Sequence, residues 1–315
     1  MSRMGCYVLD VGQGNATLIE GNSGVVLVDA GPGKTTVLKF LESHNITRLS
    51  AIFISHADKD HLGGLLAVLA KADTDASFKI DHIYVNPDSR DSDVWADIAY
   101  QLQEMERRNV TTYSPQLGPD IFEHPLDLGG CSISVLGPSK YMRLRAIGGK
   151  YQGRRKQSAN SLSAVIHVAC GGAGWILLPG DLDHLGFSDA SKNATWQPAP
   201  VLVFPHHGGR AGSDEQTRSL AHDIVQATAS EWIVFSGRGE TSKFPSPLVV
   251  DALLALSAIP SLLCIGASPV LAERIAQLAP CPHRNATGTL LVLPPTNGIV
   301  KVIDYTPPTA NPLLN

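Results

Sequence analysis

Short apolar runs, many of them ending in Gly or a polar residue, recur along almost the whole chain. Their length and their content of Val, Ile and Leu predict buried β-strands. Segments with helical spacing lie between them, so the chain is predicted to be an α/β protein with two sheets covered by helices. The runs occupy residues 6–11, 16–21, 24–31, 50–56, 81–86, 131–137, 161–169, 175–181, 200–209, 232–237, 261–266, 288–294 and 299–304.

Helices are predicted where apolar residues recur every three or four positions. The segment 93–108 has the clearest amphipathic pattern, and Asp93 is expected to be its N-cap. Only 17% of the 315 residues are charged, while 29 are Gly and 21 are Pro, which excludes a coiled coil or a long helical bundle. The predicted helices occupy residues 34–44, 61–72, 93–108, 214–226 and 247–257.

Membrane and disulfide-rich classes are also excluded. No stretch approaches the roughly 18–20 apolar residues of a membrane span, and the N-terminus lacks the apolar core of a signal peptide. We therefore expect a cytoplasmic protein with no membrane partner. The cysteines are scattered and include no C-x-x-C pair, so we interpret them as core residues. They are Cys6, Cys131, Cys170, Cys264 and Cys281.

Residues 55–64 (SHADKDHLGG) contain a dense group of potential metal ligands. Directly after an apolar strand and before a predicted helix come His56, Asp58, Asp60 and His61. Imidazoles and carboxylates at this density suit Zn²⁺, Mn²⁺ or Fe, and the oxygen ligands favour harder ions. The structural alternative is a helix cap with solvated charges.

Two later strands also end in potential ligands. Asp181 ends LLPGD, and His206 and His207 lie in FPHHGG. Each feature is weak evidence alone, because a terminal Asp is often a cap and paired His residues are often surface groups. Strand ends on one edge of an α/β fold assemble binding sites, however, so we expect one shared metal site.

These motifs carry a family resemblance. His56-x-Asp58-x-Asp60-His61 resembles the metallo-β-lactamase superfamily signature H-x-H-x-D-H, with Asp in place of the second His. This variant is similar to the metallo-hydrolase domain of the ComEC competence protein family, whose membrane channel has no counterpart here. We therefore expect a free-standing relative. The supporting motifs are DVGQGNATLI (10–19), VDAG (28–31), NSLS (160–163), PGD (179–181) and PHHGG (205–209).

The resemblance implies a four-layer αββα sandwich over residues 1–305, followed by an irregular tail at 306–315. It also implies one or two divalent ions, Zn²⁺ or Mn²⁺. His56 and Asp58 would bind one ion and Asp60 and His61 the other, with Asp181 bridging them. The implied ligand set is therefore His56, Asp58, Asp60, His61, Asp181 and His206.

Further roles follow from the same resemblance. His206 is either a ligand or the acid that protonates the leaving group, and the catalytic candidates are Asp60, His206 and His207. Positions that match the family near the site are expected to orient the ligands, with turn formation as the alternative for the first three. They are Asp10, Gln13, Asp29 and Asn160.

Two positions depart from the superfamily pattern. Phe244, in the stretch 236–247, stands where the ComEC pattern has a His. Asn160 lies near the usual third-motif His, a change that ComEC relatives share. The resemblance therefore implies that the second ion binds more weakly or only with substrate.

The substrate hypothesis rests partly on charge. Six Lys or Arg lie in the segment 143–156, which is either a solvated loop or a patch for a polyanion. The preferred hypothesis is a metal-dependent hydrolase that activates water, acting as a phosphodiesterase or nuclease on nucleic acid or nucleotide phosphoesters. The net charge of −4 weighs against non-specific nucleic-acid binding. The alternatives are an amide, lactone or thioester hydrolase of the same fold, or a catalytically weak regulatory or partner-binding module with a degenerate metal site.

Overall fold

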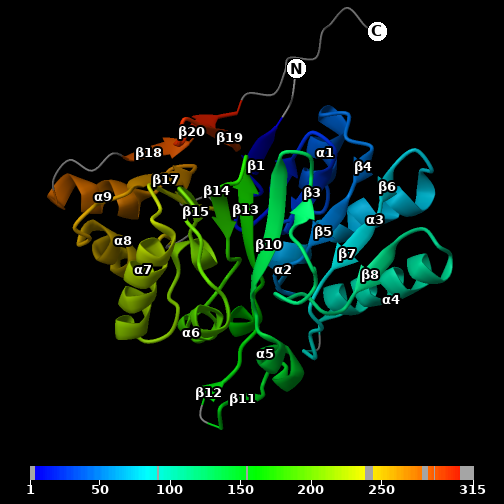
Figure 1. Ribbon diagram of the computed structural model, residues 1–315, viewed down its shortest axis with the longest axis horizontal. Helices are drawn as coiled ribbons and strands as arrows, with labels where there is room; N and C mark the ends of the chain where they lie inside the picture. Colours follow the sequence, from blue (N-terminus) through cyan, green and yellow to red (C-terminus); the bar gives the residue numbers. More distant parts are fainter. Residues whose placement is uncertain are drawn as a thin grey trace, which may run out of the picture.

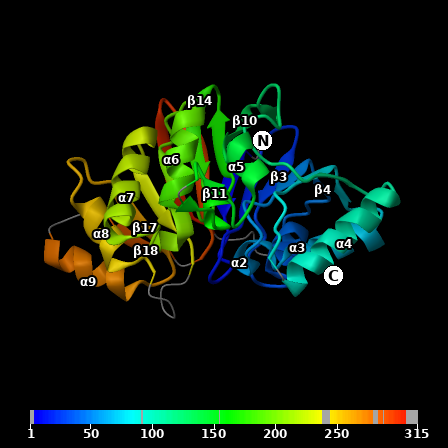
Figure 2. The same ribbon diagram turned by 90° about the horizontal axis from the view of Figure 1, so that it is seen from below.

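Two large β-sheets pack face to face, and helices cover the outer face of each (Figure 1). The view from below shows the same layers, with helices on both sides of the paired sheets (Figure 2). The αββα sandwich expected from the sequence is therefore confirmed. The computed structural model describes residues 4–90, 92–153, 155–237, 244–278, 283–286 and 288–305.

The first sheet combines the N-terminal strands with two strands from the C-terminal end of the described chain. Its pairings are antiparallel from β20 to β3 and parallel from β3 to β8. The parallel strands need helical crossovers, which explains the change of period seen in the sequence. In order, the strands are β20 (Ile299–Asp304), β19 (Leu290–Thr296), β1 (Gly5–Val8), β2 (Thr17–Glu20), β3 (Val25–Val28), β5 (Ala51–Phe53), β7 (His82–Tyr84) and β8 (Thr112–Ser114).

The second sheet has the same mixed character. Its pairings are parallel from β18 to β14 and antiparallel from β14 to β9. Its central strands are buried on both faces, as expected for parallel strands under helices. In order, the strands are β18 (His283–Ala286), β17 (Ser261–Ile265), β16 (Trp232–Phe235), β15 (Val201–Val203), β14 (Ala173–Leu178), β13 (Val165–Cys170), β10 (Cys131–Gly137) and β9 (Leu126–Asp127).

Helices and sheets bury three main apolar clusters, one between the sheets and one under each helical layer. Trp175 is buried between the sheets, and its indole N–H donates to the carbonyl of Leu293 on the opposite sheet at 3.0 Å. Among the described residues, three helices cover the first sheet and four cover the second. They are α1 (Thr36–Ser43), α3 (Leu65–Thr74) and α4 (Asp93–Arg107), and then α6 (His184–Asn193), α7 (Asp214–Thr228), α8 (Pro247–Leu254) and α9 (Pro269–Leu278).

A basic insert, residues 140–156, projects between β10 and β13 at the lower end of Figure 1. It consists of α5 (Lys140–Arg145) and the two-stranded hairpin β11 (Lys150–Tyr151) and β12 (Arg155–Lys156). A separate apolar cluster anchors it to the body of the protein, so the insert is a packed element. The cluster contains Met142, Tyr151, Leu162 and Leu185.

Several local predictions need correction. Ser92, and not Asp93, caps α4, because the Ser92 hydroxyl accepts from the backbone N–H of Trp95. The helix predicted at 61–72 is two helices, α2 (Lys59–Leu62) and α3, interrupted at Gly63 and Gly64. A Cβ on Gly64 would come within 2.3 Å of the Ala30 carbonyl oxygen, so close packing requires glycine there.

Other outcomes concern the cysteines, the tail and membrane spans. The four cysteines in the described part, including Cys6 and Cys264, are buried, as expected of core residues. Cys281 and the tail 306–315 lie outside the described residues. Among the helices of the described chain, none combines the length and apolar character needed to cross a bilayer.

Candidate metal centre

The loop after β5 carries the first group of candidate ligands. Asp58 occupies the N-cap position of α2, but its side chain makes no capping hydrogen bond. Its carboxylate instead lies with Oδ2 3.4 Å from His56 Nε2. Asp60 and His61 lie in the single turn of α2 itself, so a short helix fixes both side chains. The helix-cap alternative therefore fails for the Asp58 side chain.

The second sheet supplies the opposite side of the centre. Asp181 follows β14, and His206 and His207 follow β15 in a short 3₁₀ segment, η2 (Pro205–Gly208). Both histidines have left-handed backbones, with φ of 52° and 55°. Such non-glycine conformations cost of order 1 kcal/mol or more each and cluster at functional sites. A hydrogen bond from the His206 N–H to the Gly180 carbonyl, 3.2 Å long, ties this turn to the loop before Asp181.

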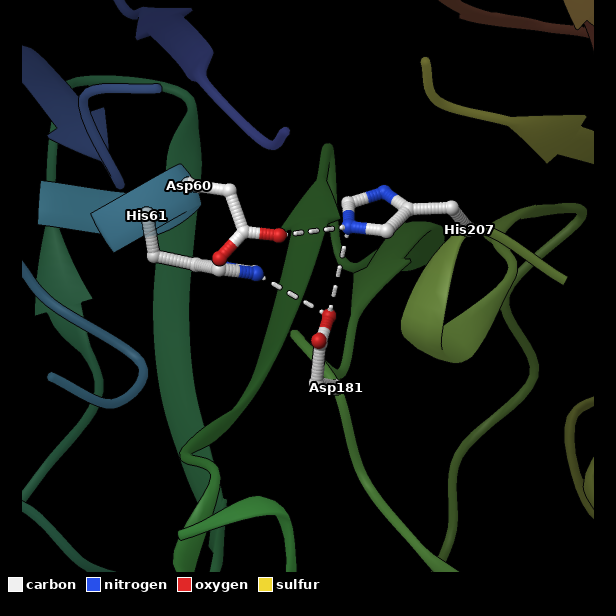
Figure 3. A group of neighbouring side chains, drawn as sticks. All are labelled: Asp60, His61, Asp181 and His207. Atoms are coloured by element: carbon white, nitrogen blue, oxygen red, sulfur yellow. Dashed lines mark hydrogen bonds and ion pairs between the residues drawn. The ribbon is translucent and has the colours of Figure 1, made fainter. Parts of the chain in front are cut away.

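Four of these side chains converge on one point and are called the inner group (Figure 3). Their potential ligand atoms all lie within 4.8 Å of one another. His61 Nε2 is 3.0 Å from Asp181 Oδ1, and His207 Nε2 is 3.2 Å from Asp60 Oδ2. His61, Asp181 and His207 are buried. The members of the inner group are Asp60, His61, Asp181 and His207.

Hydrogen bonds behind His61 set the orientation of its ring. Its Nδ1 lies 2.7 Å from Asp29 Oδ2, so Nδ1 carries the proton that Asp29 accepts. Asp29 also accepts from the Ser55 backbone N–H at 2.7 Å and from the Ser55 hydroxyl at 2.8 Å. In the neutral ring the lone pair is therefore on Nε2, which points at the inner group.

A second relay does the same for His207. The Ser236 hydroxyl donates to the side-chain carbonyl of Asn15, and Ser236 Oγ lies 2.9 Å from His207 Nδ1. Because that hydroxyl proton is already donated, Ser236 accepts from His207 Nδ1–H. His207 Nε2 is then available to the inner group. Partners of this kind fix the tautomer and the orientation of metal-binding imidazoles.

A second set of atoms, the outer group, consists of His56, Asp58 and the other oxygen of Asp181. His56 Nε2 lies 3.8 Å from Asp181 Oδ2 as well as 3.4 Å from Asp58. The guanidinium of Arg90 pairs with Asp58 and also with Asp88. Asp58 is partly exposed, so the outer group faces the surface and already holds a protein cation.

His206 lies at the edge of the centre in a different orientation. Its Nδ1 faces the centre, 2.9 Å from Asp181 Oδ2 and 3.0 Å from Asn160 Nδ2. The Phe244 ring packs edge-on against the His206 ring, with centroids 5.9 Å apart, and lies 6.2 Å from the His207 ring. Phe244 therefore supplies an apolar wall and no ligand atom.

Comparison with known proteins finds a family whose sequences resemble part of this chain. Residues 9–138 match the family model described as Metallo-beta-lactamase superfamily. This segment contains the whole loop from His56 to His61. In this segment the chain is similar to the metallo-beta-lactamase superfamily. The remaining ligands come from the second sheet, which the same sandwich places opposite the matched segment.

Individual relatives are distant. The chain is 24% identical over 266 residues to ComE operon protein 3 of Bacillus subtilis, covering 78% of this chain but only 30% of that protein. Among solved structures, YhfI of Bacillus subtilis is 15% identical, with 84% of this chain and 98% of that chain covered and a TM-score of 0.49. Igni18 of Ignicoccus hospitalis is also 15% identical, with 96% and 100% covered and a TM-score of 0.46.

The residues of the centre fit a divalent cation. Three buried atoms in the centre, His56 Nε2, His61 Nε2 and Asp181 Oδ1, have no hydrogen-bond partner among the described residues. His61 Nε2 and Asp181 Oδ1 lie 3.0 Å apart in the inner group, and His56 Nε2 lies 3.8 Å from the other Asp181 oxygen. Buried polar atoms without partners are costly, so atoms grouped around one carboxylate indicate a bound group that satisfies them. Imidazole nitrogens and carboxylate oxygens suit a divalent metal ion.

The facing carboxylates and imidazoles shift one another's pKa values. Burial alone raises the pKa of Asp181, but the facing His61, His206 and His207 hold that pKa well below its usual value. Burial opposes charge on His61, yet Asp181 and Asp29 raise its pKa well above the usual value. Burial raises the pKa of Asp60, but His207 and His61 lower it below its usual value. The carboxylates are therefore ionised near neutral pH, as cation binding requires.

The structure brings most of the predicted site residues together. Among the predicted orienting residues, Asp29 contacts His61 and Asn160 contacts His206. Asp10 accepts from the backbone N–H of Gly12, as a turn residue does, and Gln13 lies against Gly237. The sequence hypothesis assigned His206 to the ligand set, whereas the inner group contains His207. Contacts that the sequence analysis did not identify involve Asn15, Ser55, Arg90 and Ser236.

Proposed function

We propose that the protein is a divalent-metal-dependent phosphodiesterase that acts on nucleotide or nucleic-acid phosphoesters. The similarity to the superfamily and the candidate metal centre indicate a metallo-hydrolase. The observation that carries the choice of a phosphoester is the placement of fixed positive charge around an anionic centre. Phosphoryl transfer depends mainly on positioning and on the neutralisation of negative charge.

The inner and outer groups divide the metal ligands between them. The inner ion would be held by Asp60, His61, His207 and one Asp181 oxygen, and the outer ion by His56, Asp58 and the other Asp181 oxygen. Three carboxylates among six ligand residues favour Mn²⁺ or Zn²⁺ over softer ions. Bound divalent ions would supply Lewis acidity toward phosphoryl oxygens and would acidify water.

The chain's own groups then position the substrate. Arg90 lies at the rim with its guanidinium on Asp58, within reach of a phosphoryl oxygen that approaches the outer group. Phe244 and the buried strand ends exclude water from one side, which strengthens electrostatic interactions in the centre. His206 is partly exposed and borders Asp181, where it can donate a hydrogen bond to a substrate oxygen.

The basic insert supplies further positive charge at the same end of the fold. It leads directly into η1 (Asn160–Leu162), and Asn160 contacts His206. Burial and then the charge of Arg155 lower the pKa of His184, which follows Asp181 by three residues. Arg155 therefore acts close to the loop that carries Asp181. Exposed bases on the described part of the insert are Lys140, Arg145, Lys150, Arg155 and Lys156.

The test is hydrolysis by metal-loaded protein. Purified protein is assayed with Mn²⁺, Zn²⁺ or Mg²⁺ against bis-p-nitrophenyl phosphate and single-stranded DNA. We expect turnover with at least one metal and a loss of at least about a hundredfold in Asp60→Ala, because removal of a ligand removes transition-state stabilisation. Asp97→Ala, on the exposed face of α4, is the matched control and should retain activity.

Two outcomes would overturn the proposal. One is the absence of phosphodiester turnover with every metal, especially if a lactone, amide or thioester is hydrolysed instead. The other is equal turnover by wild type and Asp60→Ala, which would assign the activity to a contaminant.

A further inference from the structure

A pocket between the basic insert and the first sheet has a volume of about 240 Å³. Its walls include Pro87, Pro115, Leu144 and Leu162, so most of its surface is apolar. Arg143 also lines it. Pockets for drug-sized ligands have roughly 300–1,000 Å³, so this one suits a single ring-sized group.

The pocket lies beside the metal centre along two stretches of chain. Asn86 and Pro87 form one wall, and Asp88 follows them and binds Arg90, which in turn binds Asp58. On the other side Leu162 ends the 3₁₀ turn whose first residue, Asn160, contacts His206. Two short stretches of chain thus join the walls of the pocket to residues of the metal centre.

Hydrogen bonds hold the walls in place. Asn86 exchanges two hydrogen bonds with the backbone of Leu117, each 2.8 Å long, and so fixes the loop from Pro115 to Gly118. On the opposite wall, buried Gln157 donates to the carbonyl oxygens of Met142 and Ala146 at the end of α5. The pocket is thus built before any ligand arrives.

Arg143 gives the pocket a specific polar group. Its side chain is only 9% exposed, and one end of its guanidinium pairs with Asp120. Its Nε–H is buried and has no hydrogen-bond partner among the described residues. A Cβ on Gly118 would come within 2.6 Å of that Nε, so the guanidinium occupies space that only glycine leaves. Arg143 therefore presents a firmly packed guanidinium to an apolar pocket, which favours a ligand that carries an acceptor.

We propose that this pocket binds the nucleobase of a nucleotide phosphoester, with Arg143 donating to an acceptor on the base. The inference rests on the proposed phosphodiesterase function and specifies its substrate. Pro87 and Pro115 offer flat apolar surfaces to a planar ring, while exposed Lys140 lies at the rim for a phosphate oxygen. An apolar site with few oriented polar groups is the usual form of a small-molecule pocket.

Direct binding tests the pocket independently of hydrolysis. AMP and TMP are titrated into the protein by calorimetry, with adenosine and inorganic phosphate as separate ligands. We expect at least about tenfold weaker nucleotide binding in Arg143→Met, which keeps the side-chain length but removes the donors. Gly118→Ala, which intrudes on Arg143, should weaken binding similarly. Gly288→Ala is the matched control, because a Cβ there has no neighbour within 4 Å.

A kinetic ratio provides the second readout. Wild type should prefer thymidine 5′-(p-nitrophenyl) phosphate over methyl p-nitrophenyl phosphate, and Arg143→Met should lose that preference mainly through KM. Nucleotide binding that depends on Arg143 without any hydrolysis would support the pocket while contradicting the phosphodiesterase function.

Three results would overturn the proposal. Nucleotides could fail to bind wild type, or bind Arg143→Met as tightly as wild type. Inorganic phosphate could also bind as tightly as AMP with the same dependence on Arg143, which would make the pocket an anion site without base recognition.

Discussion

The inner and outer groups of the metal centre share Asp181 but are held in different ways. In the inner group, hydrogen bonds to Asp29 and Ser236 orient the imidazoles of His61 and His207, respectively. In the outer group, Asp58 is partly exposed and pairs with Arg90. A cation entering the inner group meets oriented ligands, whereas one entering the outer group competes with a guanidinium. We therefore expect two sites of unequal affinity, with the inner site stronger.

Asp181→Asn should have the largest effect, because the Asp181 carboxylate contacts both groups. Loss of its charge should weaken both sites and reduce hydrolysis on the order of a thousandfold. Bound metal is measured by elemental analysis after dialysis, alongside turnover. Retention of two ions per chain by this variant would contradict a shared role for Asp181.

Asp29→Asn should affect the inner group selectively. Asn tolerates the left-handed backbone at this position, where φ is 59°, but it cannot offer two charged oxygens to Ser55 and His61. Loss of such a partner typically costs about 10–100-fold in metal affinity. Calorimetric titration should show weakening of the tighter site only. Equal weakening of both sites would indicate a general structural defect.

Ser236→Ala should produce a smaller effect of the same kind. It removes the neutral acceptor of His207 Nδ1–H, and a neutral hydrogen bond contributes about 0.5–1.5 kcal/mol. Inner-site affinity should fall about three- to tenfold. The matched variant Ser219→Ala changes a hydroxyl on α7 that bonds Asp223, away from the centre, and should leave metal affinity unchanged.

Arg90→Gln should act in the opposite direction and most weakly. Arg90 is about half exposed, so its pairing with Asp58 contributes less than about 1 kcal/mol. Without it, outer-site affinity should rise a few-fold, as measured in the same titration. Because Arg90 is also proposed to contact substrate, KM for the phosphodiester should rise at the same time. An unchanged outer site would show that the guanidinium does not compete with the cation.

The sequence predicts the sandwich because most of its strands are short apolar runs with clear ends. The amphipathic pattern of residues 93–108 likewise predicts the α4 helix. The helices α5, α6 and α9 were not predicted. In α6, for example, Gly186 and several polar residues weaken the helical pattern, and packing against the second sheet compensates.

Within the centre, sequence identifies ligand types better than their arrangement. His206 and His207 are adjacent and chemically identical, and only their backbone turn places His207 Nε2 in the inner group. Arg90 lies in no sequence motif. Its approach to Asp58 depends on the path of the loop after β7, which the sequence does not predict. Ser236 lies in the stretch 236–247, where the sequence departs from the ComEC pattern. Its hydrogen bond to His207 can be recognised only from the fold.

A Mn²⁺ titration of metal-free protein tests the central claim most directly, since Mn²⁺ can be followed by both calorimetry and magnetic resonance. We expect two ions per chain with affinities that differ by at least about tenfold, and Asp29→Asn should weaken the tighter class alone. Absence of binding, or two classes of equal affinity that respond equally to Asp29→Asn, would contradict this account of the centre.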